Sequence, residues 1–164
     1  MYNRILVPLD GSRTAAAGLR EAIRLASGNA RATIRLLHVM DPLPALQGME
    51  VIITEQLIEN MEQFGRKVLK DAKSLVRRHG VGVDTVFQEQ ALGRTSDAIV
   101  KQARKWRADL IVMGTHGWSG VVRWMLGSVA HGVIQTAPCP VLTIAPASAR
   151  GESRPGAPAT EVTR

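Results

Sequence analysis

The stretch from Asp109 to Ser128 reads Asp-Leu-Ile-Val-Met-Gly-Thr-His-Gly-Trp-Ser-Gly-Val-Val-Arg-Trp-Met-Leu-Gly-Ser. After its aspartate it begins with a short apolar run, which is typical of a strand buried on both faces. A glycine-rich segment follows and leads into a helical pattern from Ser128 to Thr136. A strand, a glycine-rich loop and a helix in this order indicate one unit of an alternating α/β fold.

The rest of the chain repeats this alternation on both sides of the stretch. Apolar runs predict strands, and apolar residues spaced three and four apart predict helices. The predicted strands are 4–10, 32–40, 82–88, 109–114 and 139–145; the predicted helices are 12–26, about 51–79, 95–106 and 128–136. Such an order predicts right-handed crossovers and a doubly wound, five-stranded parallel sheet with helices on both faces. Strand 82–88 alternates apolar and polar residues, which favours an edge position.

Length and composition fit a single domain in a reducing compartment. The chain has 164 residues, 45% of them hydrophobic, and its single cysteine, Cys139, cannot form an internal disulfide. We expect one domain over residues 1–146 and a disordered tail over 147–164, which is rich in Pro, Ala, Gly, Ser and Arg. No membrane-spanning run or signal peptide is visible in the sequence, so we expect no membrane association and a cytoplasmic location.

The formal net charge of +7 raises the question of nucleic-acid binding. The basic residues are spread over several predicted elements, and aromatic residues make up only 4% of the chain. Few aromatic side chains are therefore available to stack on bases, and a solvated helix face explains the positive charge better. We expect no nucleic-acid partner.

Two strand ends stand out as candidate binding elements. Asp10 follows the first predicted strand and Gly114 ends the fourth; in a doubly wound sheet, ligands bind at such carboxyl ends. Glycines lacking a Cβ allow close approach of a ligand, and the free amides opening the helix at Ser128 suit an anion such as phosphate. The alternative is that these glycines only form tight turns.

Several blocks of the sequence resemble the universal stress protein family. The glycine spacing Gly114-x2-Gly117-x9-Gly127-Ser128 is similar to that family's ATP-binding signature, and residues 5–12, 37–39, 108–114 and 137–142 also match its pattern. The resemblance covers about residues 3–146. It implies a flavodoxin-like or Rossmann-like sheet with strand order 3-2-1-4-5, and ATP held between the first and fourth strands.

The resemblance also implies a set of binding residues and a partner. Asp10 would hold the nucleoside or a Mg²⁺ ion carried by the phosphates, Val39 would lie at adenine, and Gly127 and Ser128 would lie at the phosphates. The expected binding residues are Pro8, Leu9, Asp10, Val39, Met113, Gly114, Thr115, His116, Gly117, Arg123, Gly127, Ser128, Val129 and Ala130. A homodimer would form through the fifth strand, at Val141, Leu142, Thr143 and Ile144.

For several individual residues, the sequence is compatible with more than one role. Asp10 suits ligand contact, but an aspartate there is also a common turn or capping residue. His116 could act on a phosphate or be a solvated loop residue, and Cys139 could be a reactive thiol or a small packing residue. His38 is expected in the core or at a dimer contact. Trp118 and Trp124, which flank the loop, suit a lid, a partner surface or ordinary packing.

The sequence thus predicts an ATP-binding stress-response protein that acts as a dimeric regulatory or tolerance factor. A kinase or fast ATPase would need a Gly-Lys-Ser/Thr loop, a catalytic-loop aspartate set or a pair of Mg²⁺-holding acids. The sequence shows no such loop or aspartate set, and no pair of acids beyond Asp10 and Asp41. Any hydrolysis should therefore be slow. The alternatives are a slow Mg-dependent ATPase and a protein-interaction module that binds no nucleotide.

Overall fold

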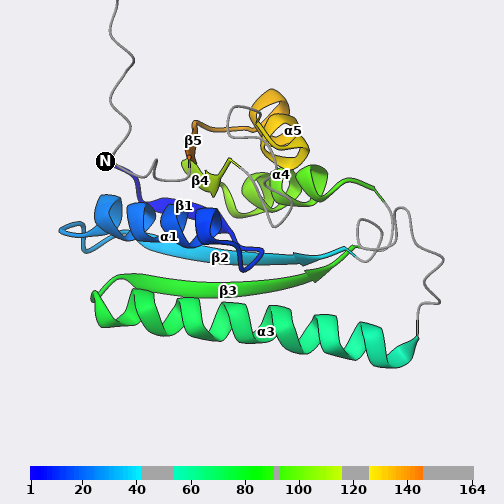
Figure 1. The fold of residues 1–164 in the computed structure, drawn as a ribbon. Coiled ribbons are helices and arrows are strands. Elements are labelled where there is room, and N and C mark those ends of the chain that lie inside the picture. Colours follow the sequence, from blue (N-terminus) through cyan, green and yellow to red (C-terminus); the bar gives the residue numbers. More distant parts are fainter. Residues whose placement is uncertain (42–53, 91–92, 116–125, 146–164) are drawn as a thin grey trace, which may run out of the picture.

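The computed structural model describes residues 1–41, 54–90, 93–115 and 126–145. These form alternating strands and helices, drawn in Figure 1. The strands are β1 Arg4–Pro8, β2 Thr33–Met40, β3 Gly82–Glu89, β4 Leu110–Gly114 and β5 Val141–Ile144. The helices are α1 Arg13–Ala26, α3 Glu55–Arg78, α4 Thr95–Trp106 and α5 Ser128–Thr136.

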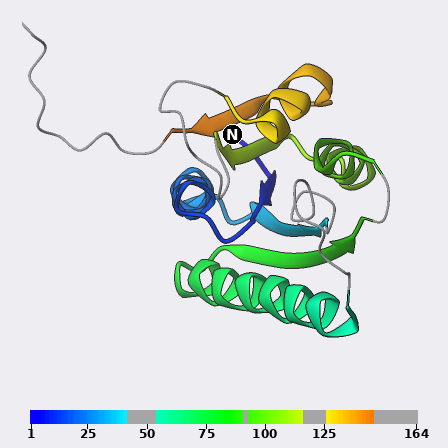
Figure 2. The same cartoon turned by 45° about the vertical axis from the view of Figure 1, so that its right-hand side comes forward.

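All strand pairs in the sheet are parallel, and the strand order is β3-β2-β1-β4-β5. This confirms the predicted doubly wound α/β sheet with order 3-2-1-4-5. β3 and β5 form the two edges of the sheet, as Figure 2 shows. The edge position of β3 agrees with its alternating sequence, because the sheet's central strands are the more continuously apolar ones.

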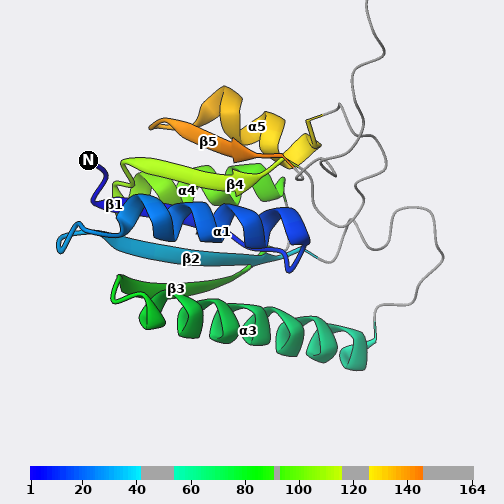
Figure 3. The same ribbon diagram turned by 60° about the vertical axis from the view of Figure 1, so that its left-hand side comes forward.

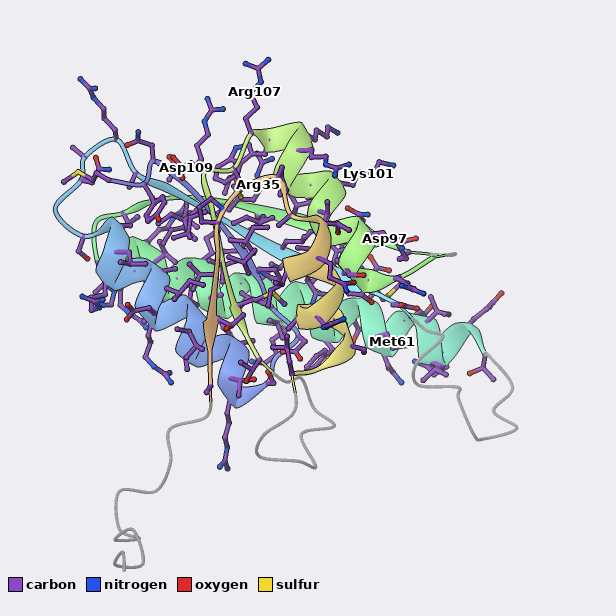
Figure 4. The ribbon with its side chains drawn as sticks, turned by 90° about the horizontal axis from the view of Figure 1, so that it is seen from above. Arg35, Met61, Asp97, Lys101, Arg107 and Asp109 are labelled. Carbon is purple, nitrogen blue, oxygen red and sulfur yellow. The ribbon has the colours of Figure 1, made fainter. Side chains whose placement is uncertain are left out.

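The core lies in two layers, one on each face of the sheet. Ile5 and Val7 of β1 pack with residues of α1 and α3, whereas Leu6 packs with residues of α4 and α5. Because successive strand residues point to opposite faces, one apolar run supplies both layers. Figure 3 shows α1 on one side of the sheet and α4 on the other. The outer side of α4 carries charged residues such as Asp97 and Lys101 (Figure 4).

Two of the described helices, α1 and α3, begin just after a capping residue in the sequence. The Ser12 hydroxyl accepts a hydrogen bond from the Ala15 N–H at 3.2 Å, so α1 begins just after it, as predicted. The Thr54 hydroxyl accepts from the Leu57 N–H in the same way. α3 therefore begins at Glu55, later than the predicted start near Val51, because the cap fixes Thr54 in an extended conformation.

The ends of the elements differ from prediction by a few residues. β5 covers Val141–Ile144 rather than 139–145, and Pro140, which has no N–H to donate, immediately precedes it. β1 ends at Pro8, because Asp10, Gly11 and Ser12 form a turn in which Gly11 has a φ of +86°. The predicted tail, 147–164, lies outside the described residues.

Candidate nucleotide site

A cavity of about 280 Å³ lies at the carboxyl ends of β1 and β4. It is therefore located at the switch point of the sheet, where ligands of doubly wound folds bind. Every predicted site residue that the structure describes lines this cavity: Pro8, Leu9, Asp10, Val39, Met113, Gly114, Thr115, Gly127, Ser128, Val129 and Ala130. The predicted residues His116, Gly117 and Arg123 lie outside the described part of the chain, as do Trp118 and Trp124.

The cavity also contains residues that the sequence analysis missed. They are Ala15, Leu37, Thr95 and Ile99. Leu37 is two residues before Val39 on the same strand, so the period of two could have placed it on the same face. Thr95 and Ile99 are four residues apart on α4 and share a helix face, but only the fold brings that helix to the site.

The start of α5 forms the donor end of the cavity. Its N-cap is Gly127, which has no side chain to cap the helix, and the first intrahelical bond runs from the His131 N–H to the Gly127 carbonyl at 2.9 Å. The amides of Ser128, Val129 and Ala130 therefore have no acceptor within the helix. Together with the positive end of the helix dipole, they form a site suited to an anion.

The Gly127 amide itself has a structural role. Its N–H donates to the Thr115 carbonyl at 2.9 Å, and the Thr115 N–H donates to the Ile144 carbonyl at 3.0 Å. These bonds join the end of β4 to β5 and to the start of α5. The Gly127 N–H is therefore used within the fold, and the amides without an intrahelical acceptor lie at the next three positions.

Gly114 is required by the packing of β4 against α1. A Cβ at this position would lie 2.7 Å from the Thr14 hydroxyl oxygen and 2.8 Å from the Thr14 carbonyl carbon. The end of β4 and the first turn of α1 therefore meet without space for a side chain. The close contact between β4 and α1 therefore needs a glycine at position 114 whether or not a ligand is bound.

Asp10 both lines the cavity and shapes the turn beside it. Its carboxylate oxygen Oδ1 accepts a hydrogen bond from the Ser12 N–H at 2.9 Å, which is an Asx turn. The structure thus bears out the turn role considered for this residue. The hydroxyl of Thr95, another lining residue, donates to the Asp41 carboxylate at 3.0 Å, which joins the end of β2 to the start of α4.

His38 is a core residue behind the cavity wall. Its side chain is 7% exposed, its Nδ1 lies 2.8 Å from the Leu9 carbonyl oxygen, and its ring stacks on Phe87. Burial lowers the pKa of His38, with the Leu9 hydrogen bond and Asp10 opposing this effect. A neutral ring whose Nδ1–H donates to Leu9 fits this environment, and it fixes the backbone of a cavity residue.

Other candidate reactive groups give no support for catalysis in the described residues. Cys139 is half-buried against the α4 and α5 layer, and burial, followed by the charge of Asp109, raises the pKa of its thiol. No group of three or more His, Cys, Asp or Glu in the described residues could hold a metal ion. Nor does any helix within the described ranges have the length and apolarity needed to cross a membrane.

Comparison with known proteins agrees with this geometry. The model of the universal stress protein family matches residues 1–145. A universal stress protein of Methanocaldococcus jannaschii is 37% identical over 145 residues, covering 88% of this chain and 82% of its own length.

Two solved structures of universal stress proteins are also similar. One, from Burkholderia pseudomallei, has a TM-score of 0.69 and 33% identity, over 88% of this chain and 97% of that one. The other, from Archaeoglobus fulgidus in complex with dAMP, has a TM-score of 0.61 and 28% identity, over 87% and 98%. With its five-stranded order and these matches, the chain belongs to the universal stress protein family.

Proposed function

We propose that this protein binds ATP in the cavity at the ends of β1 and β4 and acts as a dimeric regulatory or tolerance factor in stress. The proposal rests on one observation: the same cavity is lined by apolar side chains and by a helix start that has no side-chain cap. The similar Archaeoglobus fulgidus protein was solved with dAMP, an adenine nucleotide, which supports the same ligand class here.

The cavity residues suggest how the nucleotide is held. Leu37, Val39 and Ile99 form apolar surface suited to the adenine ring, and backbone groups at the ends of β1 and β2 can recognise its edge. The amides of Ser128 to Ala130 would bind the phosphates. Asp10 lines the same cavity, and we expect it to contact the ribose or a Mg²⁺ ion carried by the phosphates.

Binding without fast chemistry is the better account of this site. Its described lining contains Asp10 as its single ionisable side chain, so a proton-transfer pair and a cation at the γ-phosphate are both missing from that lining. A nucleotide held this way can alter the protein's stability and its surface, which is sufficient for a regulatory role. A slow, Mg-dependent hydrolysis is the alternative.

Substitution of Gly127 by Asp tests the site. The new carboxylate would stand at the helix start, where it would repel phosphate, and we expect ATP affinity to fall by roughly 100-fold, which corresponds to about 2.7 kcal/mol. Isothermal titration with ATP, ADP and AMP measures this. Ser74→Asp on the exposed side of α3 adds the same charge elsewhere and should bind like the unmodified protein.

The contrary outcomes of this titration separate the alternatives. Unchanged ATP affinity in Gly127→Asp would refute the phosphate assignment. A failure of the unmodified protein to bind any of the three nucleotides would favour an interaction module without nucleotide. Protein-dependent phosphate release that is lost in Asp10→Ala would favour the slow ATPase.

A further inference from the structure

Among the described residues, the backbone groups along one side of β3 have no strand partner. β3 pairs only with β2 in the described sheet, and the Gln90 N–H donates to the Met40 carbonyl of β2. The backbone N–H and C=O groups of successive strand residues point to opposite sides of the strand. The N–H groups of Gln88, Val86 and Asp84 therefore also point to β2. The N–H and C=O groups of the intervening residues, Val83, Thr85, Phe87 and Glu89, then point outward.

A basic groove runs beside this edge. It has a volume of about 400 Å³ and is lined by Arg66, Leu69, Lys70 and Lys73 of α3 and by Thr85 and Phe87 of β3. Figure 1 shows α3 running alongside β3. Thr85 and Phe87, two of the four β3 residues whose backbone groups point outward, therefore also line the groove. A strand added to this edge would place every second side chain beneath the cations of α3.

The charges in the groove are only partly neutralised by the protein. The Arg66 guanidinium lies 2.6 Å from the Glu62 carboxylate and 4.8 Å from the centroid of the Phe87 ring. Within the described residues, no carboxylate lies within 4.0 Å of the ammonium groups of Lys70 or Lys73. Arg66, Lys70, Lys73 and Arg77 follow at intervals of four, three and four, so they share one helix face.

This charge distribution selects the kind of occupant. A second copy of the chain paired edge to edge would bring two rows of cations together, which is unfavourable. The protein's own segment 147–164 holds three arginines and two glutamates, so it is not acidic. An extended segment of another protein with acidic residues at alternate positions complements both the open backbone and the cations.

We propose that the β3 edge and the α3 groove bind an extended acidic peptide segment of a partner protein, which adds to the sheet as a further strand. Main-chain hydrogen bonds to the outward groups of β3 would supply affinity. Acidic side chains on one face of the segment would contact Lys70 and Lys73 and so select the partner. This site is separate from the nucleotide cavity and does not depend on the function proposed for it.

A fluorescent peptide of alternating Thr and Glu, seven residues long, is a suitable probe. We expect its anisotropy to rise with the full-length protein, and Lys70→Glu/Lys73→Glu to weaken binding by about tenfold or more at low salt. Lys101→Glu/Lys105→Glu makes the same charge change on exposed positions of α4 and should leave binding within about twofold. Equal losses in both double variants would overturn the proposal.

Backbone pairing is tested independently of charge. Thr85→Pro removes one outward N–H from an edge strand and should abolish peptide binding while the melting temperature stays near that of the unmodified protein. Because proline could still disturb the strand, two modified peptides provide a second test. One is N-methylated at every Glu and the other at every Thr; only the one whose methyl groups face β3 should lose binding.

The modified peptides also separate strand addition from simple attraction of polyanions. Equal binding of both N-methylated peptides would overturn the proposal, since charge alone would then explain the interaction. The same conclusion would follow if a single-stranded oligouridylate of equal charge bound as tightly as the unmethylated peptide. Absence of binding by the unmethylated peptide would also refute the site.

Discussion

Several residues at the proposed site also stabilise the fold around the cavity. Asp10 closes an Asx turn, Gly114 lets β4 approach α1, and His38 holds the Leu9 carbonyl. The sequence alone offers a binding role and a structural role for such residues. In this protein the two roles are compatible, because Asp10 and Gly114 make these structural contacts and also line the cavity.

His38 should make stability depend on pH. Its pKa is lowered in the folded protein by burial, so below about pH 6.5 the unfolded chain binds a proton more readily than the folded one. His38 therefore makes its full contribution to the free energy of unfolding above about pH 6.5. This contribution falls as the pH drops towards the folded-state pKa, by at most about 1.4 kcal/mol per pH unit.

Denaturant unfolding at several pH values measures this effect. In His38→Asn, an amide N–H can still donate to Leu9, but no proton is taken up, so the decline that His38 contributes should disappear even though lost ring packing lowers overall stability. His79→Asn, at an exposed position, serves as the control. A decline below pH 6.5 that is identical in His38→Asn and the unmodified protein would contradict this assignment.

The helix starts differ in whether a side chain caps them. α1 and α3 have hydroxyl caps from Ser12 and Thr54, whereas α4 and α5, with Arg94 and Gly127 at their N-caps, have no side-chain cap. A helix start without a side-chain cap, directed into a cavity, leaves donors for a ligand. The lack of a cap is therefore informative only when the fold shows what the helix start faces.

β5 provides a prediction about assembly. The carbonyls of Pro140 and Ile144 accept hydrogen bonds from Ile111 of β4 and from Thr115 just after it, so the intervening N–H of Thr143 points away from β4. If a homodimer forms through this edge, Thr143→Pro should convert it to a monomer without breaking the β4–β5 pairing. Size-exclusion chromatography with light scattering measures the mass. A monomeric unmodified protein, or a Thr143→Pro dimer, would contradict the proposed interface.

The sequence was most informative about elements with strong patterns. The helices 95–106 and 128–136 were predicted at their observed bounds, and the strand order implied by the family resemblance is confirmed. Residues such as Thr95 and Ile99 were missed because no local pattern reveals which helix start reaches a distant strand end. Similarly, the hydrogen bond from the Gly127 N–H to the Thr115 carbonyl joins residues that no local pattern brings together.

At the scale of the whole molecule, three surfaces are spatially separate. The cavity lies at the carboxyl ends of the central strands, the basic groove lies at the β3 edge, and the proposed dimer edge lies at β5 on the opposite side (Figure 2). A nucleotide, an acidic segment and a second copy of the chain could therefore be bound together. Such an arrangement suits a protein that works by binding.

The central claim is that the amides at the start of α5 bind the phosphates of ATP. Nitrogen–proton NMR spectra recorded with ATP and with adenosine test it most directly. We predict that ATP shifts the amide signals of Ser128, Val129 and Ala130 strongly, whereas adenosine shifts mainly signals near Val39 and Met113. Unchanged Ser128 to Ala130 signals at saturating ATP would contradict the account.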